Sequence, residues 1–188
     1  GISCLNLEVL SNTKKSCCVS RSFRHPIDQI EDLKESISNY GSRAAEKIRE
    51  DNLTTQLISV FIMTNHFNKK EKQYSNSIRL QLDYPTSNSI IIVKRAIQGI
   101  EKIFKKGYQY KKAGIILYEL SNSYSMRGLL DYDREKSDSL MKALDEINGR
   151  FNSPKLKIAS EGIEKNWQIK REKISPCYTT RFEEIKIV

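Results

Sequence analysis

The pattern of apolar and polar positions predicts a strand and then a helix at the start of the 188-residue chain. Residues 16–23 (S-C-C-V-S-R-S-F) combine small, β-branched and aromatic residues, which is typical of a short strand. Asp28 and Glu31, three residues apart, resemble a capping box at the start of a helix. Apolar residues then recur every three or four positions up to about Arg49, and these are Ile30, Leu33, Ile37, Tyr40, Ala44 and Ile48.

The next 65 or so residues predict two strands, a helix and a last strand. Residues 54–64 form a nearly continuous apolar run rich in β-branched residues, and residues 76–84 alternate between apolar and polar. A helix follows Pro85, ends near Gly107, and has as its buried stripe Ile90, Val93, Ile97, Ile100 and Phe104. Residues 111–119 supply the last strand. The order β-α-β-β-α-β predicts an α+β, ferredoxin-like domain, a four-stranded antiparallel sheet with two helices on one face.

The composition changes after residue 120. Residues 121–133 are small and polar apart from a few apolar side chains, which is typical of a linker carrying a short motif. Residues 135–148 predict one more helix, with the stripe Leu140, Leu144 and Ile147. We therefore expect a leading linker (1–15), the sheet domain (16–120), a second linker (121–133) and a small helical or irregular tail (134–188). The single Trp, at 167, is expected to form the core of that appendage.

The charge balance favours a polyanionic partner. Lys and Arg total 32 against 23 acidic residues, which gives +9 at pH 7 and points to nucleic acid or an anionic membrane surface. No apolar run approaches the ~20 residues of a membrane-spanning helix, and no secretory signal is visible. The four cysteines form no C-x-x-C pair, so we expect reduced thiols in a cytoplasm and no metal site. The missing initiating Met suggests a fragment or a processed product.

Catalytic motifs are not apparent in the sequence. There is no G-x-G-x-x-G, no phosphate-binding P-loop and no Ser/His/Asp or Cys/His frame. Asp131 and Asp133 lie in the expected linker and are interpreted as surface acids. The chain by itself is therefore expected not to be an enzyme and to need no cofactor.

Alternation in the third predicted strand suggests a DNA-binding face. Ser77, Arg79 and Gln81 point away from the helices, on the face that a two-layer domain leaves free. Ser20 and Ser22 share one face of the first strand, while Arg21 shares its parity with apolar neighbours and stays ambiguous. Such side chains contact phosphates without reading sequence. The predicted DNA-binding residues are Ser20, Arg21, Ser22, Ser77, Arg79, Gln81, Lys111 and Lys112.

Several segments resemble the UmuC family, the catalytic subunits of DNA polymerase V within the Y-family of translesion polymerases. The most specific match is the ending S-P-C-Y-T-T-R (175–181) after W-Q-I-K-R (167–171). Cys177 stands where the family usually has Arg. Other matching segments are G-I-S-C-L-N-L-E (1–8), V-S-R-S-F (19–23), S-R-A-A-E-K-I-R (42–49), Y-Q-Y-K-K-A-G-I (108–115) and residues 158–163.

The resemblance implies that the chain is the DNA-gripping little-finger domain and the tail of such a polymerase. The palm carboxylates that hold catalytic Mg²⁺ in the family would precede residue 1. For the whole polymerase, the family implies a role in DNA repair and SOS mutagenesis in the bacterial cytoplasm, at the nucleoid. The partners implied are primer-template DNA, the sliding clamp, the processed UmuD dimer and the RecA filament.

The family's clamp-binding peptide corresponds here to a degenerate segment. The usual motif is Gln, two variable residues, Leu and Phe. This chain has Met126 in place of Gln and Leu130 in place of Phe, so only Leu129 fits. The candidate clamp-binding residues are Met126, Leu129 and Leu130, and we expect weak binding.

Three other function classes remain as alternatives. An RNA-recognition module has the same element order, but it would carry stacking aromatics on the two central strands, whereas the third strand offers Ser77, Arg79 and Gln81. A regulatory ferredoxin-like module that binds a metabolite would not need a charge of +9. A membrane-surface role would require a helix that pairs a basic face with an exposed apolar face.

Overall fold

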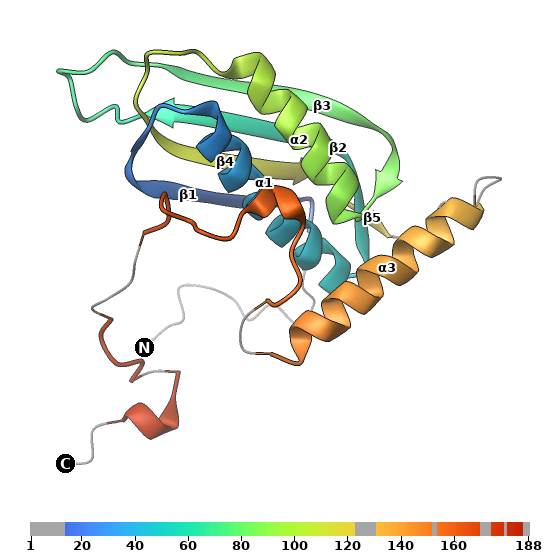
Figure 1. Cartoon of the computed structure of the whole chain (residues 1–188). Coiled ribbons are helices and arrows are strands. Elements are labelled where there is room, and N and C mark those ends of the chain that lie inside the picture. The colour runs from blue at the N-terminus through green and yellow to red at the C-terminus, as the bar shows by residue number, and fades with distance from the viewer. Residues whose placement is uncertain (1–13, 123–130, 152–153, 170–173, 179, 186–188) are drawn as a thin grey trace, which may run out of the picture.

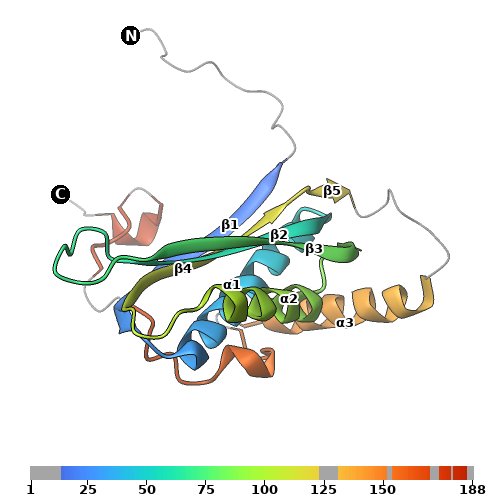
Figure 2. The same cartoon turned by 90° about the horizontal axis from the view of Figure 1, so that it is seen from above.

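The protein folds as a single antiparallel sheet with its helices packed on one side (Figures 1 and 2). The computed structural model describes residues 14–122, 131–151, 154–169, 174–178 and 180–185. Figure 2 shows α1, α2 and α3 on the same side of the sheet, so its other side forms an open face. The predicted α+β architecture, with its β-α-β-β-α-β order, is confirmed.

The sheet is built from four long strands in the order β1-β4-β2-β3, each antiparallel to its neighbour. They are β1 (Ser16–Ile27), β2 (Leu53–Thr64), β3 (Ser75–Thr86) and β4 (Tyr110–Tyr118). A two-residue strand, β5 (Ser121–Asn122), pairs with the start of β2. Because β4 lies between β1 and β2, the unit β1-α1-β2 is split, as the element order predicted.

The first helix, α1 (Ile30–Glu50), follows its predicted apolar stripe. Leu33, Ile37 and Ile48 are fully buried against the sheet. The predicted capping box is absent, because Gln29 occupies the N-cap without a side-chain hydrogen bond. Asp28 instead accepts a hydrogen bond from the Gln29 side chain at 3.0 Å.

The second helix, α2 (Ser89–Ile103), buries a face that is rotated from the prediction. Asn88 caps the helix by accepting the backbone N–H of Ile90 at 2.7 Å, and this start leaves Ile90 exposed. The buried face includes Gly99, where an added Cβ would come within 2.5 Å of Val60 Cγ2. The helix therefore approaches β2 closely at this glycine. Its buried residues are Ser89, Ile92, Val93, Ala96, Gly99, Ile100 and Ile103.

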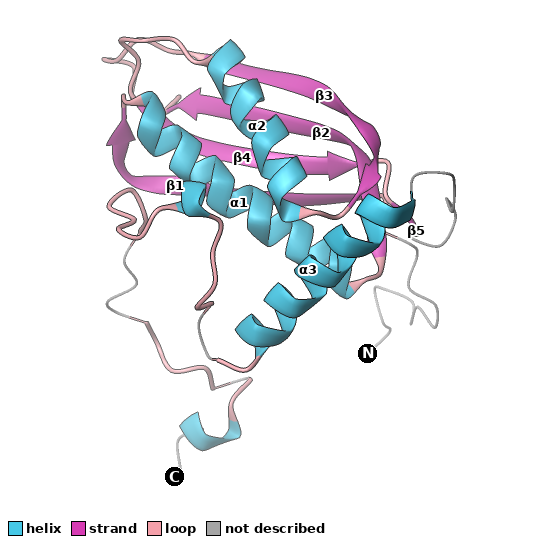
Figure 3. Cartoon of the chain, turned by 45° about the vertical axis from the view of Figure 1, so that its right-hand side comes forward, coloured by secondary structure: helices cyan, strands magenta, loops and turns pink. Residues whose placement is uncertain are grey.

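The third helix, α3 (Asp131–Gly149), lies beside α1 and α2 on the helix side of the sheet (Figure 3). It packs through a mainly polar face rather than through its predicted apolar stripe. Leu140 is 52% exposed and Ile147 is 38% exposed, so the prediction was wrong for these two residues, whereas Leu144 is half-buried. Met141 is buried instead, because it points at the N-terminus of α2, where the backbone N–H of Ser89 donates to the Met141 sulfur with 3.4 Å between nitrogen and sulfur. Around it, Asn88 donates to Ser137 at 2.6 Å and Arg49 pairs with Asp145 at 2.6 Å.

The chain after α3 returns to the sheet domain through residues 154–168. It includes the short 3₁₀ helix η2 (Ala159–Glu161); a second, η3 (Phe182–Glu184), lies near the C-terminus. Trp167 packs edge-on against Phe23 and Tyr40, with ring centroids 6.2 and 5.7 Å away. Its Nε1–H donates to Glu35 at 2.8 Å. Trp167 is therefore part of the core beneath the sheet, and not the core of a separate appendage.

Candidate nucleic-acid interface

The open face is defined by rows of residues that lie directly opposite one another across the four strands. Directly opposite residues of an antiparallel sheet project to the same side. One row contains Ser20, Gly114, Phe61 and Ser77. The next row contains Cys18, Ile116, Ser59 and Arg79. The edge strands β1 and β3 thus supply polar and cationic side chains, and the central strands supply mostly apolar ones.

Arg79 lies on the open face, as the sequence predicted. Its guanidinium carbon is 5.4 Å from the centre of the Tyr118 ring, and the side chain is exposed. Ser77 and Gln81, two residues to either side, are exposed on the same strand. A cation placed over an aromatic ring is attracted to its face, so Tyr118 helps to orient Arg79 at the surface.

The residues of β1 divide between the two faces. Ser20 and Ser22 lie on the open face, opposite Gly114 and Lys112. Arg21 lies opposite Ala113, on the helix side of the sheet. Burial raises the pKa of the Tyr40 hydroxyl on α1, and the charge of Arg21 partly opposes that rise. The structure therefore does not bring Arg21 together with the other predicted DNA-binding residues.

Only one of the two predicted DNA-binding lysines of β4 has its side chain on the open face. Lys112 is half-buried on the open face, beside Ser22. Lys111 donates from Nζ to the backbone carbonyl of Phe23 at 2.7 Å. This bond holds the ammonium group of Lys111 at the irregular end of β1, away from the centre of the open face.

Two aromatic residues on the central strands were missed by the sequence reasoning. Phe61 on β2 and Tyr118 on β4 both project from the open face. An RNA-recognition module was expected to carry its stacking aromatics on a central third strand, but in this sheet β3 is an edge strand and the central strands are β4 and β2. Residues 57–63 are apolar apart from Ser59, so no regular alternation along this segment distinguishes Phe61 on the open face from the core side chains.

The predicted clamp-binding residues Met126, Leu129 and Leu130 lie outside the described residues. Among the described residues, no group of three or more His, Cys, Asp and Glu could hold a metal ion. No helix in that part of the chain is long and apolar enough to cross a membrane.

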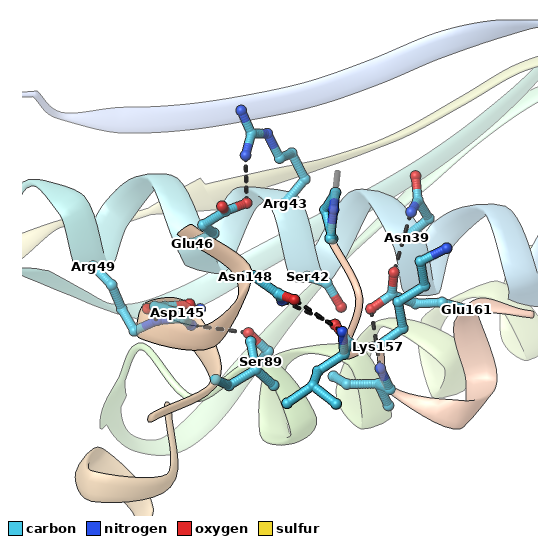
Figure 4. A pocket seen from close by; sticks show the side chains of 14 residues that line it. Asn39, Ser42, Arg43, Glu46, Arg49, Ser89, Asp145, Asn148, Lys157 and Glu161 are labelled. Atoms are coloured by element: carbon cyan, nitrogen blue, oxygen red, sulfur yellow. Dashed lines mark hydrogen bonds and ion pairs between the residues drawn. The ribbon is translucent and has the colours of Figure 1, made fainter. Parts of the chain in front are cut away.

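A small hollow between α1, α3 and residues 154–161 is lined by charged side chains that pair with one another (Figure 4). Arg49 binds Asp145 and also donates to Ser89 at 2.8 Å. Glu161 accepts from Asn39 at 3.2 Å. The hollow has a volume of about 80 Å³, well below the ~300 Å³ at which small-molecule pockets begin. It serves as a packing junction between the helices and the returning chain, and it gives the metabolite-binding alternative no support.

Two family models match the chain. The model described as "impB/mucB/samB family C-terminal domain" matches residues 14–129. A second model, described as a domain of unknown function (DUF4113), matches residues 138–188.

Curated relatives match along the whole chain. Protein UmuC of Salmonella typhimurium is 34% identical over 98% of this chain, and Protein ImpB of Salmonella typhimurium is 35% identical over 100% of it. Protein MucB of Escherichia coli is 32% identical over 100% of it. The chain spans less than half the length of these relatives, 44%, 45% and 44% respectively.

A solved structure described as "Complex of beta-clamp processivity factor and little finger domain of PolIV" is 14% identical, with a TM-score of 0.40. It covers 61% of this chain, and the chain covers 97% of it. The family model, by contrast, covers more than half of the chain and agrees with the segments that resemble UmuC. The chain therefore belongs to the impB/mucB/samB family of UmuC-related proteins and carries the C-terminal domain of that family.

Proposed function

We propose that this chain is the non-catalytic DNA-binding and partner-docking region of an error-prone translesion DNA polymerase. Its open sheet face grips primer-template DNA through the phosphate backbone. The observation that carries this proposal is that Ser77, Arg79 and Gln81 are exposed along β3, on the same face of the sheet as Ser20 and Ser22 on the opposite edge strand β1. Family membership and the net charge of +9 support it.

The geometry of the sheet suits the dimensions of a DNA groove. Three strand spacings separate β1 from β3, which places the two polar edges roughly 14 Å apart. The major groove of B-DNA is ~12 Å wide, so the two edges can reach the phosphates on its opposite rims. The apolar middle of the face makes no base-specific hydrogen bonds, which fits a protein that must accept any template sequence.

Duplex binding tests this proposal directly. Fluorescence anisotropy of the purified chain on two unrelated primer-template sequences should give similar affinities that fall steeply as salt rises, because phosphate contacts release condensed counterions. A strong preference for one sequence, or an affinity that does not depend on the salt concentration, would contradict binding through the phosphate backbone.

The chain is proposed to lack polymerase activity of its own. In the parent enzyme, palm carboxylates holding Mg²⁺ would catalyse nucleotide transfer, and this region would hold the DNA. Incubation of the chain with primer-template, nucleotides and magnesium should leave the primer unextended. Extension above a control without protein would refute this part.

We propose the sliding clamp, the processed UmuD dimer and the RecA filament as partners of the parent polymerase, acting in SOS mutagenesis and DNA repair at the bacterial nucleoid. Pull-downs with each purified partner should retain the chain. Retention by none of the three would leave DNA as the chain's only proposed partner.

RNA binding is a second candidate because Phe61 and Tyr118 lie on the open face of the two central strands. Stacking aromatics at such positions serve single-stranded RNA in modules of the same element order. Affinities for single strands of RNA and DNA of equal length distinguish the two candidate functions. If the chain binds RNA more tightly than DNA, and Phe61→Ala removes this preference, the RNA function is favoured.

A further inference from the structure

Two loops form one end of the domain, opposite α3. They are the β2–β3 connection (65–74) and the α2–β4 connection (104–109), and the first projects beyond the sheet (Figures 1 and 2). Tyr74 joins them: its hydroxyl donates to the Ile103 carbonyl at 2.7 Å and its ring lies 4.9 Å from that of Tyr108. The Lys105 ammonium lies 4.9 Å from the centre of the Tyr74 ring. The two loops therefore form a joined surface.

This end of the domain is strongly basic. Its lysines are exposed, and among the described residues none of them forms an ion pair. A single acid, Glu71, lies within the two loops. We call this surface the basic tip, and define it by Lys69, Lys70, Lys72, Lys105 and Lys106 together with Phe67.

Phe67 is presented to solvent by a loop that is braced from within. Its side chain is 82% exposed, and its backbone N–H donates to the Asn65 side chain at 3.2 Å. Gln73 donates to the carbonyls of Asn65 and Asn68 at 3.2 and 2.8 Å. The His66 ring lies 3.9 Å from the Phe67 ring. The loop thus holds an aromatic pair at the surface instead of burying it.

An open hollow lies beside this pair. Its volume is about 470 Å³, and it lies between the β2–β3 connection and the adjoining ends of β2 and β3. Met63 and Ser75, which lie opposite each other on β2 and β3, are shared with the open face of the sheet. The hollow is lined by Met63, Thr64, His66, Gln73, Tyr74 and Ser75.

We infer that the basic tip is a second DNA site, which binds single-stranded DNA. The lysines contact the phosphates, and an unpaired base stacks on Phe67 and His66. Single strands are bound in this way because every base offers a flat face to an aromatic side chain, while lysines follow the backbone. Bases within a duplex are already stacked on one another, so their faces are not accessible to the Phe67 ring. This inference rests on the proposed DNA-binding function and deepens it. The basic tip binds the single-stranded part of the DNA, and the open face of the sheet binds the duplex part.

Loss of the aromatic ring tests the stacking. We expect Phe67→Ala to weaken binding of the whole chain to a short oligothymidine by about fivefold or more. Its binding to an abasic strand of equal length and charge should not change. Phe182→Ala is the matched control, since Phe182 is an 89% exposed phenylalanine far along the chain. Equal affinities of Phe67→Ala and Phe182→Ala for oligothymidine would overturn the inference.

Loss of two lysines tests the charge. The salt slope is the slope of the logarithm of the binding constant against the logarithm of the salt concentration. Lys69→Ala with Lys70→Ala should reduce the magnitude of this slope for oligothymidine by about 1.4, because each phosphate contact to a single strand contributes about 0.7. Lys94→Ala with Lys142→Ala removes the same charge from exposed positions on α2 and α3 and should leave the slope nearer that of the parent. Equal slopes for the two double variants would refute a localised site. Thermal melts should show that all variants fold.

The failure of this inference is distinguishable from failure of the proposed function. If Arg79→Ala weakens duplex binding while Phe67→Ala leaves oligothymidine binding intact, the sheet proposal stands and the tip inference falls. If Phe67→Ala weakens oligothymidine binding while Arg79→Ala leaves duplex binding intact, the basic tip stands as a DNA site and the proposed DNA-binding role of the sheet face is wrong. If the tip variants weaken binding to phosphatidylserine-containing vesicles but not to oligothymidine, the surface is a membrane site and the inference is wrong.

Discussion

The ring of Phe61 lies over Gly114 on the open face of the sheet. A Cβ built on Gly114 would come within 2.5 Å of Phe61 Cζ and within 2.5 Å of the Ser20 Cβ. The glycine therefore leaves the space into which Phe61 reaches from β2 across β4, toward β1. This arrangement fixes the aromatic centre of the face between its two polar edges.

Replacing this glycine should distort the sheet. We expect Gly114→Ala to destabilise the protein by about 1–3 kcal/mol, because the added methyl would collide with the Phe61 ring and with the Ser20 Cβ. The Ser20 Cβ is bonded directly to the backbone of β1, so it cannot move away without moving the strand. Urea unfolding measures the change. Gly149→Ala, where an added Cβ meets nothing within 4 Å, should leave stability unchanged or slightly raised. Equal stabilities of Gly114→Ala and the parent would show that Phe61 does not occupy this space.

Trp167 should report on the whole core. The chain has one Trp, and it packs against Phe23 and Tyr40. Tryptophan fluorescence and far-ultraviolet circular dichroism should therefore show the same unfolding midpoint. Trp167→Ala should cost about 3–5 kcal/mol, as for other buried Trp residues. Ile163→Ala, at a 94% exposed position, should stay within about 0.5 kcal/mol of the parent. Two separate transitions would mean that the returning chain folds apart from the sheet.

Arg79 should contribute to DNA binding without contributing much to stability. Arg79→Ala should weaken binding to two unrelated duplexes by similar factors and reduce the salt slope by about 1, because a phosphate contact reads no bases. Arg43→Ala is the matched control: Arg43 is an exposed arginine on α1, on the opposite side of the sheet. The comparison needs anisotropy across a salt series and a thermal melt. An Arg79→Ala protein that melts normally and binds both duplexes like Arg43→Ala would remove Arg79 from the DNA surface.

The apolar pair in the second linker should anchor weak clamp binding. A peptide of residues 121–133 should bind the cognate sliding clamp weakly, since short peptides dock through a few apolar anchors and this one lacks the family's Gln and Phe. Titration of the peptide with Leu129→Ala and Leu130→Ala versions measures each contribution. Tight binding that survives both changes would place the anchors elsewhere, and an absence of binding would leave the segment as a plain linker.

The sequence by itself determined the order of the elements and the buried face of α1. Both follow from local periodicity: a helix repeats every 3.6 residues and a strand every two, so a single apolar stripe such as Leu33, Ile37 and Ile48 shows which side is buried. The alternation in β3 placed Arg79 on the open face for the same reason. Sequence segments also identified the family, because similarity between related chains does not depend on knowing their fold.

The tertiary structure decided what depends on pairing between distant segments. The order β1-β4-β2-β3 made β2 and β4 central, and so brought Phe61 and Tyr118 onto the open face. Register placed Arg21 opposite Ala113 and away from that face. Trp167 reached Glu35, 132 residues earlier in the chain. Local periodicity gives the direction of a side chain within its own element. Which other element it meets is set by the burial and hydrogen bonding of the whole chain, and no stretch of sequence contains that information by itself.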